Sequence, residues 1–109
     1  MLVTLMAILA LQTATPQART ANCFVNGAQT SVRCAIVVNR TIPGTVIVSY
    51  GFGGDNNVHY VGPKVDARSS QVTSIQVRNS PRVPDTGVCI ADSEAASCMV
   101  DGLQIIGIY

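Results

Sequence analysis

Few residues of this 109-residue chain have the chemistry of a catalytic site. His59 is the only histidine, and its place in Val58-His59-Tyr60-Val61 predicts an outer or edge face of a strand. A Ser-His-Asp arrangement would need Asp55 or Asp66 and one of the serines. No spacing supports it, and no G-x-S-x-G turn occurs. The sequence therefore predicts a protein that is not an enzyme, with a weak hydrolase that uses His59 as an alternative.

The segment GFGGDNN at residues 51–57 places glycines beside side chains that carry oxygen atoms. Phosphate binding by such a loop requires a helix directly after it, and the residues that follow read as a strand. Asp55, Asn56 and Asn57 offer oxygen ligands for a cation. A turn is the simpler interpretation, because Gly and Asn accept left-handed backbone conformations. We expect no cofactor and no bound metal.

The segment Ser80-Pro81-Arg82-Val83-Pro84-Asp85 is the most suggestive surface feature. Prolines on both sides of Arg82 and Val83 hold the backbone extended and reduce the entropy lost on docking. A rigid loop that offers one Arg, close to a disulfide-bonded Cys89, meets the physical requirements of a protease-inhibitor loop. Arg82 and Val83 are therefore the predicted binding residues. A connection between strands without a binding role is the alternative.

Four cysteines in a short chain favour two disulfides in an oxidising compartment; they are Cys23, Cys34, Cys89 and Cys98. Zinc sites favour C-x-x-C pairs, and these spacings are wider. Three connectivities are possible, and we favour the two local ones, Cys23–Cys34 and Cys89–Cys98. A two-residue turn at Asn26-Gly27 would, however, place Thr30 opposite Cys23. A bulge, a wider turn or another pairing would each resolve this conflict.

The apolar run Met1 to Leu11 is interrupted by one polar side chain, Thr4. It is shorter than the ~20 residues of a membrane-spanning helix, and a polar stretch follows it. Residues 1–18 are therefore predicted to be a signal peptide with an undetermined cleavage site. A retained anchor and a helix packed on the domain are the alternatives. Residues 19–109 would form one secreted domain, without stable membrane insertion after removal of the leader.

The remaining elements read as short strands. Two β-branched runs, residues 35–38 and 46–48, flank Pro43-Gly44 and predict a central hairpin. Residues 71–78 alternate polar and apolar side chains as a half-buried strand does. We expect seven or eight strands in an all-β fold, a small antiparallel β-sandwich of the Greek-key type with two disulfides. Seven Lys and Arg against six Asp and Glu, without a block of like charge, exclude a nucleic-acid footprint.

Four matches follow one another between residues 46 and 77: Phe52-Gly53-Gly54-Asp55, Val58-His59-Tyr60, Gly62-Pro63 and Thr73-Ser74-Ile75-Gln76-Val77. In this order they resemble a βγ-crystallin Greek-key motif. The resemblance implies a folded hairpin corner at Phe52 and Gly54, and at Thr73-Ser74 the element that helps to bind calcium in that family. Ser69-Ser70 stand where the family has paired Asn or Asp, so we assign no calcium site. A bacterial and fungal inhibitor group resembling βγ-crystallins would fit the inhibitor interpretation.

Asn39-Arg40-Thr41 matches the N-glycosylation pattern at an exposed strand end, so Asn39 is a predicted glycosylation site in a eukaryotic host. Taken together, these features predict a small secreted β-sandwich that binds an unknown protein or surface ligand through its loops. A serine protease inhibitor that uses Arg82 and Val83, and an exported toxin or effector, are the alternatives.

Overall fold

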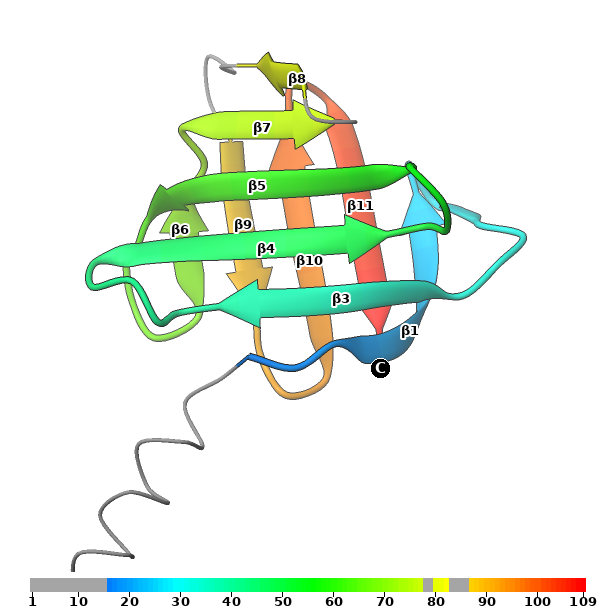
Figure 1. Cartoon of the computed structure of the whole chain (residues 1–109), viewed down its shortest axis with the longest axis horizontal. Coiled ribbons are helices and arrows are strands. Elements are labelled where there is room, and N and C mark those ends of the chain that lie inside the picture. The colour runs from blue at the N-terminus through cyan, green and yellow to red at the C-terminus, as the bar shows by residue number, and fades with distance from the viewer. Residues whose placement is uncertain (1–15, 78–79, 83–86) are drawn as a thin grey trace, which may run out of the picture.

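Every regular element in the described part of the chain is a β-strand. The structure is a computed structural model, and it describes residues 16–77, 80–82 and 87–109 (Figure 1). The strands are β1 (Arg19–Val25), β2 (Ala28–Gln29), β3 (Cys34–Asn39), β4 (Thr45–Gly51), β5 (Asn57–Pro63), β6 (Ser69–Gln71), β7 (Ser74–Val77), β8 (Ser80–Arg82), β9 (Gly87–Ala91), β10 (Ala95–Val100) and β11 (Leu103–Ile108). The predicted all-β, antiparallel architecture is confirmed.

One continuous sheet forms two layers that face each other (Figure 1). The strand order is β6-β9-β10-β11-β1-β3-β4-β5-β7-β8, with β2 beside β1. In Figure 1, β3, β4, β5 and β7 run across the front, and β9, β10 and β11 run in another direction behind them. The two layers share β1, because residues 19–21 pair with β3 and residues 22–25 pair with β11. A strand that changes sheets in this way forms the corner between two crossed layers.

At the other corner the sheet nearly closes into a barrel. β6 ends the strand order, yet Ser70 forms an isolated bridge with Lys64 directly after β5. Gly62 allows this approach, because a Cβ atom at this position would collide with the backbone carbonyl of Gln71. β7 and β8 continue the front layer beyond this seam.

The segment predicted as one strand, residues 71–78, is described up to Val77, and this part is divided between the two layers. Val72 N–H donates to the carbonyl oxygen of Gly87 in the rear layer (2.9 Å), and Thr73 N–H donates to that of Val61 in the front layer (2.8 Å). The chain therefore changes layers between Val72 and Thr73, and β6 and β7 are separate strands. This division adds one strand to the predicted number. β8 adds another, because Ser80–Arg82, predicted as part of a loop, pair with β7, and the short β2 is a third.

Alternating side chains of the two layers fill the space between them. On β4, Val46, Val48 and Tyr50 are buried while the residues between them are half-buried, as a strand with one core-facing side requires. The ring of Tyr50 meets Tyr60 edge to face at 6.0 Å, and its hydroxyl donates to the carbonyl oxygen of Ile105 (3.3 Å). Tyr50 on the front layer is thereby bonded to β11 on the rear layer.

The predicted central hairpin is confirmed. Thr45 N–H donates to the carbonyl oxygen of Ile42 across Pro43-Gly44 (3.1 Å), and Gly44 has a φ of +72°. Pro at the second and Gly at the third position of a tight turn are the residues that this geometry favours. The register places Val38 of β3 opposite Val48 of β4.

Both favoured disulfides are present, Cys23–Cys34 and Cys89–Cys98. Cys89 and Cys98 are direct partners on β9 and β10. The conflict at Asn26-Gly27 has a simple solution, because β1 has two different neighbours. The turn does place Thr30 beside Cys23, with a hydrogen bond from Thr30 N–H to the Cys23 carbonyl oxygen (2.9 Å).

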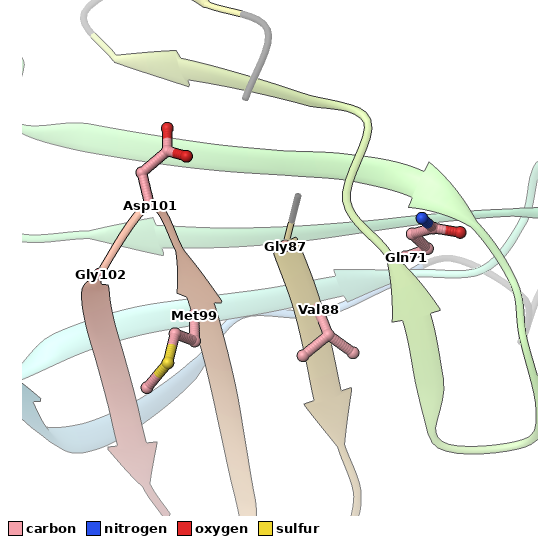
Figure 2. A pocket seen from close by; sticks show the side chains of 6 residues that line it. All are labelled: Gln71, Gly87, Val88, Met99, Asp101 and Gly102. Carbon is pink, nitrogen blue, oxygen red and sulfur yellow. The ribbon is translucent and has the colours of Figure 1, made fainter. Parts of the chain in front are cut away.

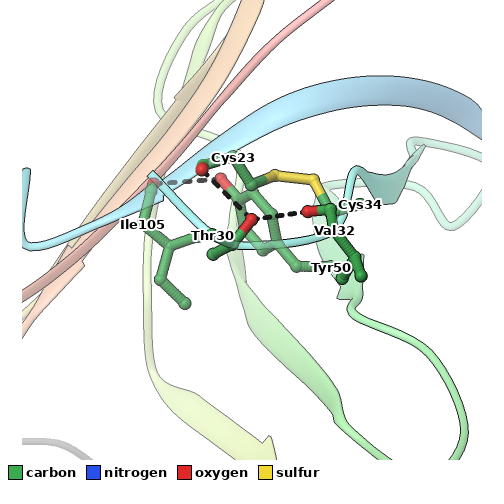
Figure 3. Close-up of a disulfide and its surroundings, with 6 residues drawn as sticks. All are labelled: Cys23, Thr30, Val32, Cys34, Tyr50 and Ile105. Carbon is green, nitrogen blue, oxygen red and sulfur yellow. Dashed lines mark hydrogen bonds between the residues drawn. A yellow bond between two sulfur atoms is a disulfide. The ribbon is translucent and has the colours of Figure 1, made fainter. Parts of the chain in front are cut away.

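After Thr30 the chain returns along the first half of β1, where Cys34 is opposite Ala21. Ala21 and Cys23 both face the core, so the disulfide joins Cys34 to Cys23 diagonally (Figure 3). The Thr30 hydroxyl donates to the carbonyl oxygen of Val32 (2.6 Å) and closes the connection.

The first and last strands meet at one corner of the molecule. The guanidinium group of Arg19 lies 3.7 Å from the centre of the Tyr109 ring and also donates to the carbonyl oxygen of Ser93 (3.2 Å). Tyr109 N–H donates to the carbonyl oxygen of Glu94 (3.0 Å). The predicted signal peptide, residues 1–18, lies outside the described residues except for its last three. Nowhere in the described parts of the chain is there a helix with the length and apolar character needed to cross a bilayer.

Candidate functional site

Of the two predicted binding residues, the structure describes the position of Arg82, and Val83 lies outside the described residues. Arg82 ends β8, the last strand in the order, and is opposite Ile75 of β7. Pro81 is opposite Gln76. The backbone of Ser80–Arg82 is therefore extended and lies at the edge of the front layer.

His59 lies on the outer side of the front layer, between a buried Tyr60 and a half-buried Val58. Its Nδ1 atom is 2.7 Å from the Ser49 hydroxyl on β4. A hydroxyl beside an imidazole is part of a nucleophilic site, but a hydrolase also needs a group that orients the imidazole. The positions in the same row across the sheet are Val37 and Gln76, neither of which is a carboxylate. The contact is a cross-strand pair that stabilises β4 against β5.

The loop at residues 51–57 forms a tight turn between β4 and β5. Phe52 N–H donates to the carbonyl oxygen of Asn56 (2.9 Å), and Asn56 N–H donates to that of Gly53 (3.1 Å). Among the described residues, no three His, Cys, Asp or Glu side chains gather in a way that could hold a metal ion.

The predicted glycosylation site, Asn39, is half-buried at the end of β3. Its side-chain carbonyl oxygen accepts hydrogen bonds from the backbone N–H of Thr41 (2.9 Å) and from the Thr41 hydroxyl (2.7 Å). The three residues of the sequence pattern thus form one local turn. Glycosylation of Asn39 stays a prediction.

The sequence interpretation did not identify the outer side of the rear layer, which is apolar and uncharged. We call it the apolar face, and its large side chains are Phe24, Val88, Ile90, Met99, Ile106 and Ile108. Exposed fractions are 45% for Val88, 39% for Ile90, 46% for Met99 and 47% for Ile108. Phe24 and Ile106 are half-buried. These residues alternate with core residues, so their side chains point away from the front layer.

Strand pairing arranges these side chains in rows across the rear layer. Val88 is opposite Met99, and Ile106 is opposite both Ser97 and Phe24. Ile90 is also opposite Ser97, so a small residue lies between two isoleucines in the central row. The remaining outward positions of the layer are uncharged as well: Asn22, Ser69, Gln71, Ala95 and Gln104.

A shallow cavity of about 410 Å³ hollows one end of the apolar face. Figure 2 shows Val88 and Met99 side by side on β9 and β10, with Gln71 on β6 and Asp101 at the turn after β10. Gly87 and Gly102 complete the lining. The cavity can accept an apolar side chain of a partner.

Charged residues lie in the turns at the two ends of the apolar face. Asp92 and Glu94 follow β9, and Asp101 follows β10. The Asp92 carboxylate accepts hydrogen bonds from the backbone N–H groups of Glu94 (2.9 Å) and Ala95 (3.0 Å), which hold the pKa of Asp92 below its usual value. Arg19 donates to the carbonyl oxygen of Ser93 (3.2 Å) and Arg40 to that of Ala91 (3.2 Å), at the same end as Asp92. The face is thus apolar in its centre and carries charges of both signs at this end.

The cysteines carry the signal that would have identified the apolar face. Two disulfide-bonded cysteines on neighbouring strands must both face the core, so the residues beside them face outward. This places Val88 and Ile90 on the outer side of β9, and Met99 on the outer side of β10. A sequence that puts large apolar residues at positions fixed as outward indicates a contact surface.

No family model matches the sequence, and no curated protein or solved structure matches the chain.

Proposed function

We propose that the protein is a small secreted binding protein that acts without catalysis, through β8 and the connection that follows it. The observation that supports this proposal is the position of β8. It is the last strand in the order, and among the described residues it pairs with β7 alone. The unpaired side of an edge strand is accessible to an extended segment of another protein, and Pro81 can offer it a backbone carbonyl oxygen but no N–H.

Arg82 gives this edge a chemical preference. Pro81 fixes the backbone dihedral φ directly before it, so little conformational entropy is lost when the strand is bound. An extended backbone that ends in one Arg suits a trypsin-like protease, whose specificity pocket carries a carboxylate. The specific form of the proposal is therefore a serine protease inhibitor that presents Arg82 and Val83.

Secretion, the Greek-key sandwich and the likeness to βγ-crystallins belong to the same proposal. Two disulfides within a domain of this size support an oxidising compartment outside the cytosol. The apolar run at residues 1–11 supports an export signal. Cys23–Cys34 links β1 to β3 and Cys89–Cys98 links β9 to β10, which suits a rigid binding module.

The test is inhibition of a trypsin-like protease by the purified protein, with Arg82→Ala and Arg33→Ala compared. Arg33 is exposed in the connection before β3, far along the chain from β8, and serves as the matched control. We expect Arg82→Ala to weaken inhibition about 100-fold, the effect of removing a central Arg from an interface. Arg33→Ala should inhibit as the unchanged protein does. Absence of inhibition, or equal inhibition by both variants, would contradict the inhibitor form.

A further inference from the structure

We propose that the apolar face is the contact surface of a reversible homodimer, in which two copies of the chain pack rear layer against rear layer. The apolar face is separate from β8, which belongs to the front layer (Figure 1). The proposal is therefore independent of the proposed function.

The first argument is the chemistry of the apolar face. Val88, Ile90, Met99 and Ile108 are between 39% and 47% exposed on neighbouring strands. Monomeric proteins expose few large contiguous apolar surfaces, and a larger one marks a contact site. The burial of these side chains against a second apolar surface is favourable.

The second argument is the absence of charge. No described outward position carries a charged side chain in residues 22–25 of β1 or on β6, β9, β10 and β11. A charged protein partner would find no complementary group in the centre of this surface. A second copy meets it without repulsion, and the net charge of the chain is only +1. Little long-range repulsion therefore opposes the approach of two copies.

A lipid surface fits the apolar face less well. Proteins that lie on membranes combine apolar side chains with Lys or Arg, often with Trp, at the boundary. Arg19 and Arg40 lie beside Asp92 at one end, but the described outward positions of the apolar face carry no Lys or Arg, and the chain contains no Trp.

The third argument is that the central row of the apolar face can pack on its own copy. Ile90, Ser97 and Ile106 form a row that runs across the strands. A two-fold axis parallel to this row, between the two copies, places the row of one copy against the same row of the other. The same axis places Met99 of one copy above Ala95 of the other, because these residues lie two positions on either side of Ser97 on β10. A long side chain then meets a short one twice, by symmetry.

The area predicts a weak dimer. Five strands about 4.8 Å apart and about six residues long cover ~24 Å by ~20 Å, or ~500 Å² per copy. Two copies would bury ~1,000 Å² in total, the size of a transient interface. A dissociation constant of about 10 to 100 µM agrees with this size.

The test is sedimentation equilibrium of the full chain with both disulfides intact. The protein concentration is varied from about 1 µM to about 1 mM, a range in which a dimer with a micromolar dissociation constant forms and dissociates. Ile90→Glu places two carboxylates against each other at the axis and should weaken the dimer more than tenfold. Ile42→Glu is the matched control, because Ile42 is 49% exposed in the turn between β3 and β4. Ile42→Glu should dimerise as the unchanged chain does.

Three results would overturn the proposal. The first is an unchanged chain that is monomeric up to about 1 mM, far above the expected dissociation constant. The second is a dimer that Ile90→Glu leaves intact. The third is a monomer that binds vesicles of phosphatidylcholine and loses this binding in Ile90→Glu, which would assign the apolar face to lipid.

Discussion

Gly107 of β11 is a point of close approach between the two layers, and replacing it tests how they pack. A Cβ atom at Gly107 would overlap Cδ1 of Ile36, which comes from β3 in the opposite layer, and would lie 3.2 Å from Sγ of Cys23. The backbone of Gly107 is outside the left-handed region, so alanine adopts it without strain. Gly107→Ala therefore measures the overlap with Ile36 rather than a backbone effect.

The expected free energies follow from this contact. Overpacking a core costs about 1–3 kcal/mol, and Gly107→Ala should fall in this range. Ile36→Val removes Cδ1 and should cost about 1 kcal/mol alone. In the double variant the new methyl group occupies the space that Cδ1 leaves. We expect the double variant to cost about 1 kcal/mol, which corresponds to a coupling of about 1–3 kcal/mol.

The assay is equilibrium unfolding in guanidinium chloride with both disulfides intact, for all four members of the double-mutant cycle. The control cycle combines Ile36→Val with Gly87→Ala, because a Cβ atom at Gly87 would meet Val100 and not Ile36. Its free energies should add within about 0.5 kcal/mol. Additivity in the Gly107 cycle as well, or a neutral Gly107→Ala, would refute the packing of β11 against β3.

Three further predictions concern turns and titrating groups. Asn26→Ala removes a hydrogen bond from Gln104 N–H (2.8 Å) and places alanine at a φ of +50°, so thermal denaturation should show a loss of about 1–2 kcal/mol. The lowered pKa of Asp92 stabilises the folded protein above the unfolded pKa of about 4, and this contribution is lost as the pH falls. As the pH falls from about 5 to about 2, the Tm of Asp92→Ala should therefore decrease less than the Tm of the unchanged protein. Burial raises the pKa of the Tyr50 phenol above its usual range, so the free energy of unfolding should fall above about pH 10. The decrease should be smaller in Tyr50→Phe, and unfolding followed by circular dichroism measures it.

The local parts of the fold were predictable because short segments determine them. Pro43-Gly44 forms its turn from its own backbone preferences. The same holds for Asn26-Gly27, which takes positive φ at both residues. Cys89 and Cys98 could be paired from their separation along the chain, because a short hairpin brings them together.

The arrangement of the layers was not predictable from such segments. β1 pairs with β3 over its first half and with β11 over its second, and the two partners are far apart in sequence. The alternation in residues 71–78 continues through the change of layer at Val72 and Thr73, so periodicity alone gave one strand. The apolar face was overlooked because apolar side chains on a strand do not by themselves show which side faces the core. The cysteines beside Val88 and Met99 fix that side.

The contact between Arg19 and Tyr109 joins the two termini of the domain at one corner. A short linker between them would convert the chain into a ring in which every strand keeps its neighbours. New termini could then be opened at the exposed turn of Ile42, Pro43 and Gly44, which loses only the covalent connection between β3 and β4. A circularly permuted protein of this design should fold, because the pairing of its strands does not depend on where the chain is opened.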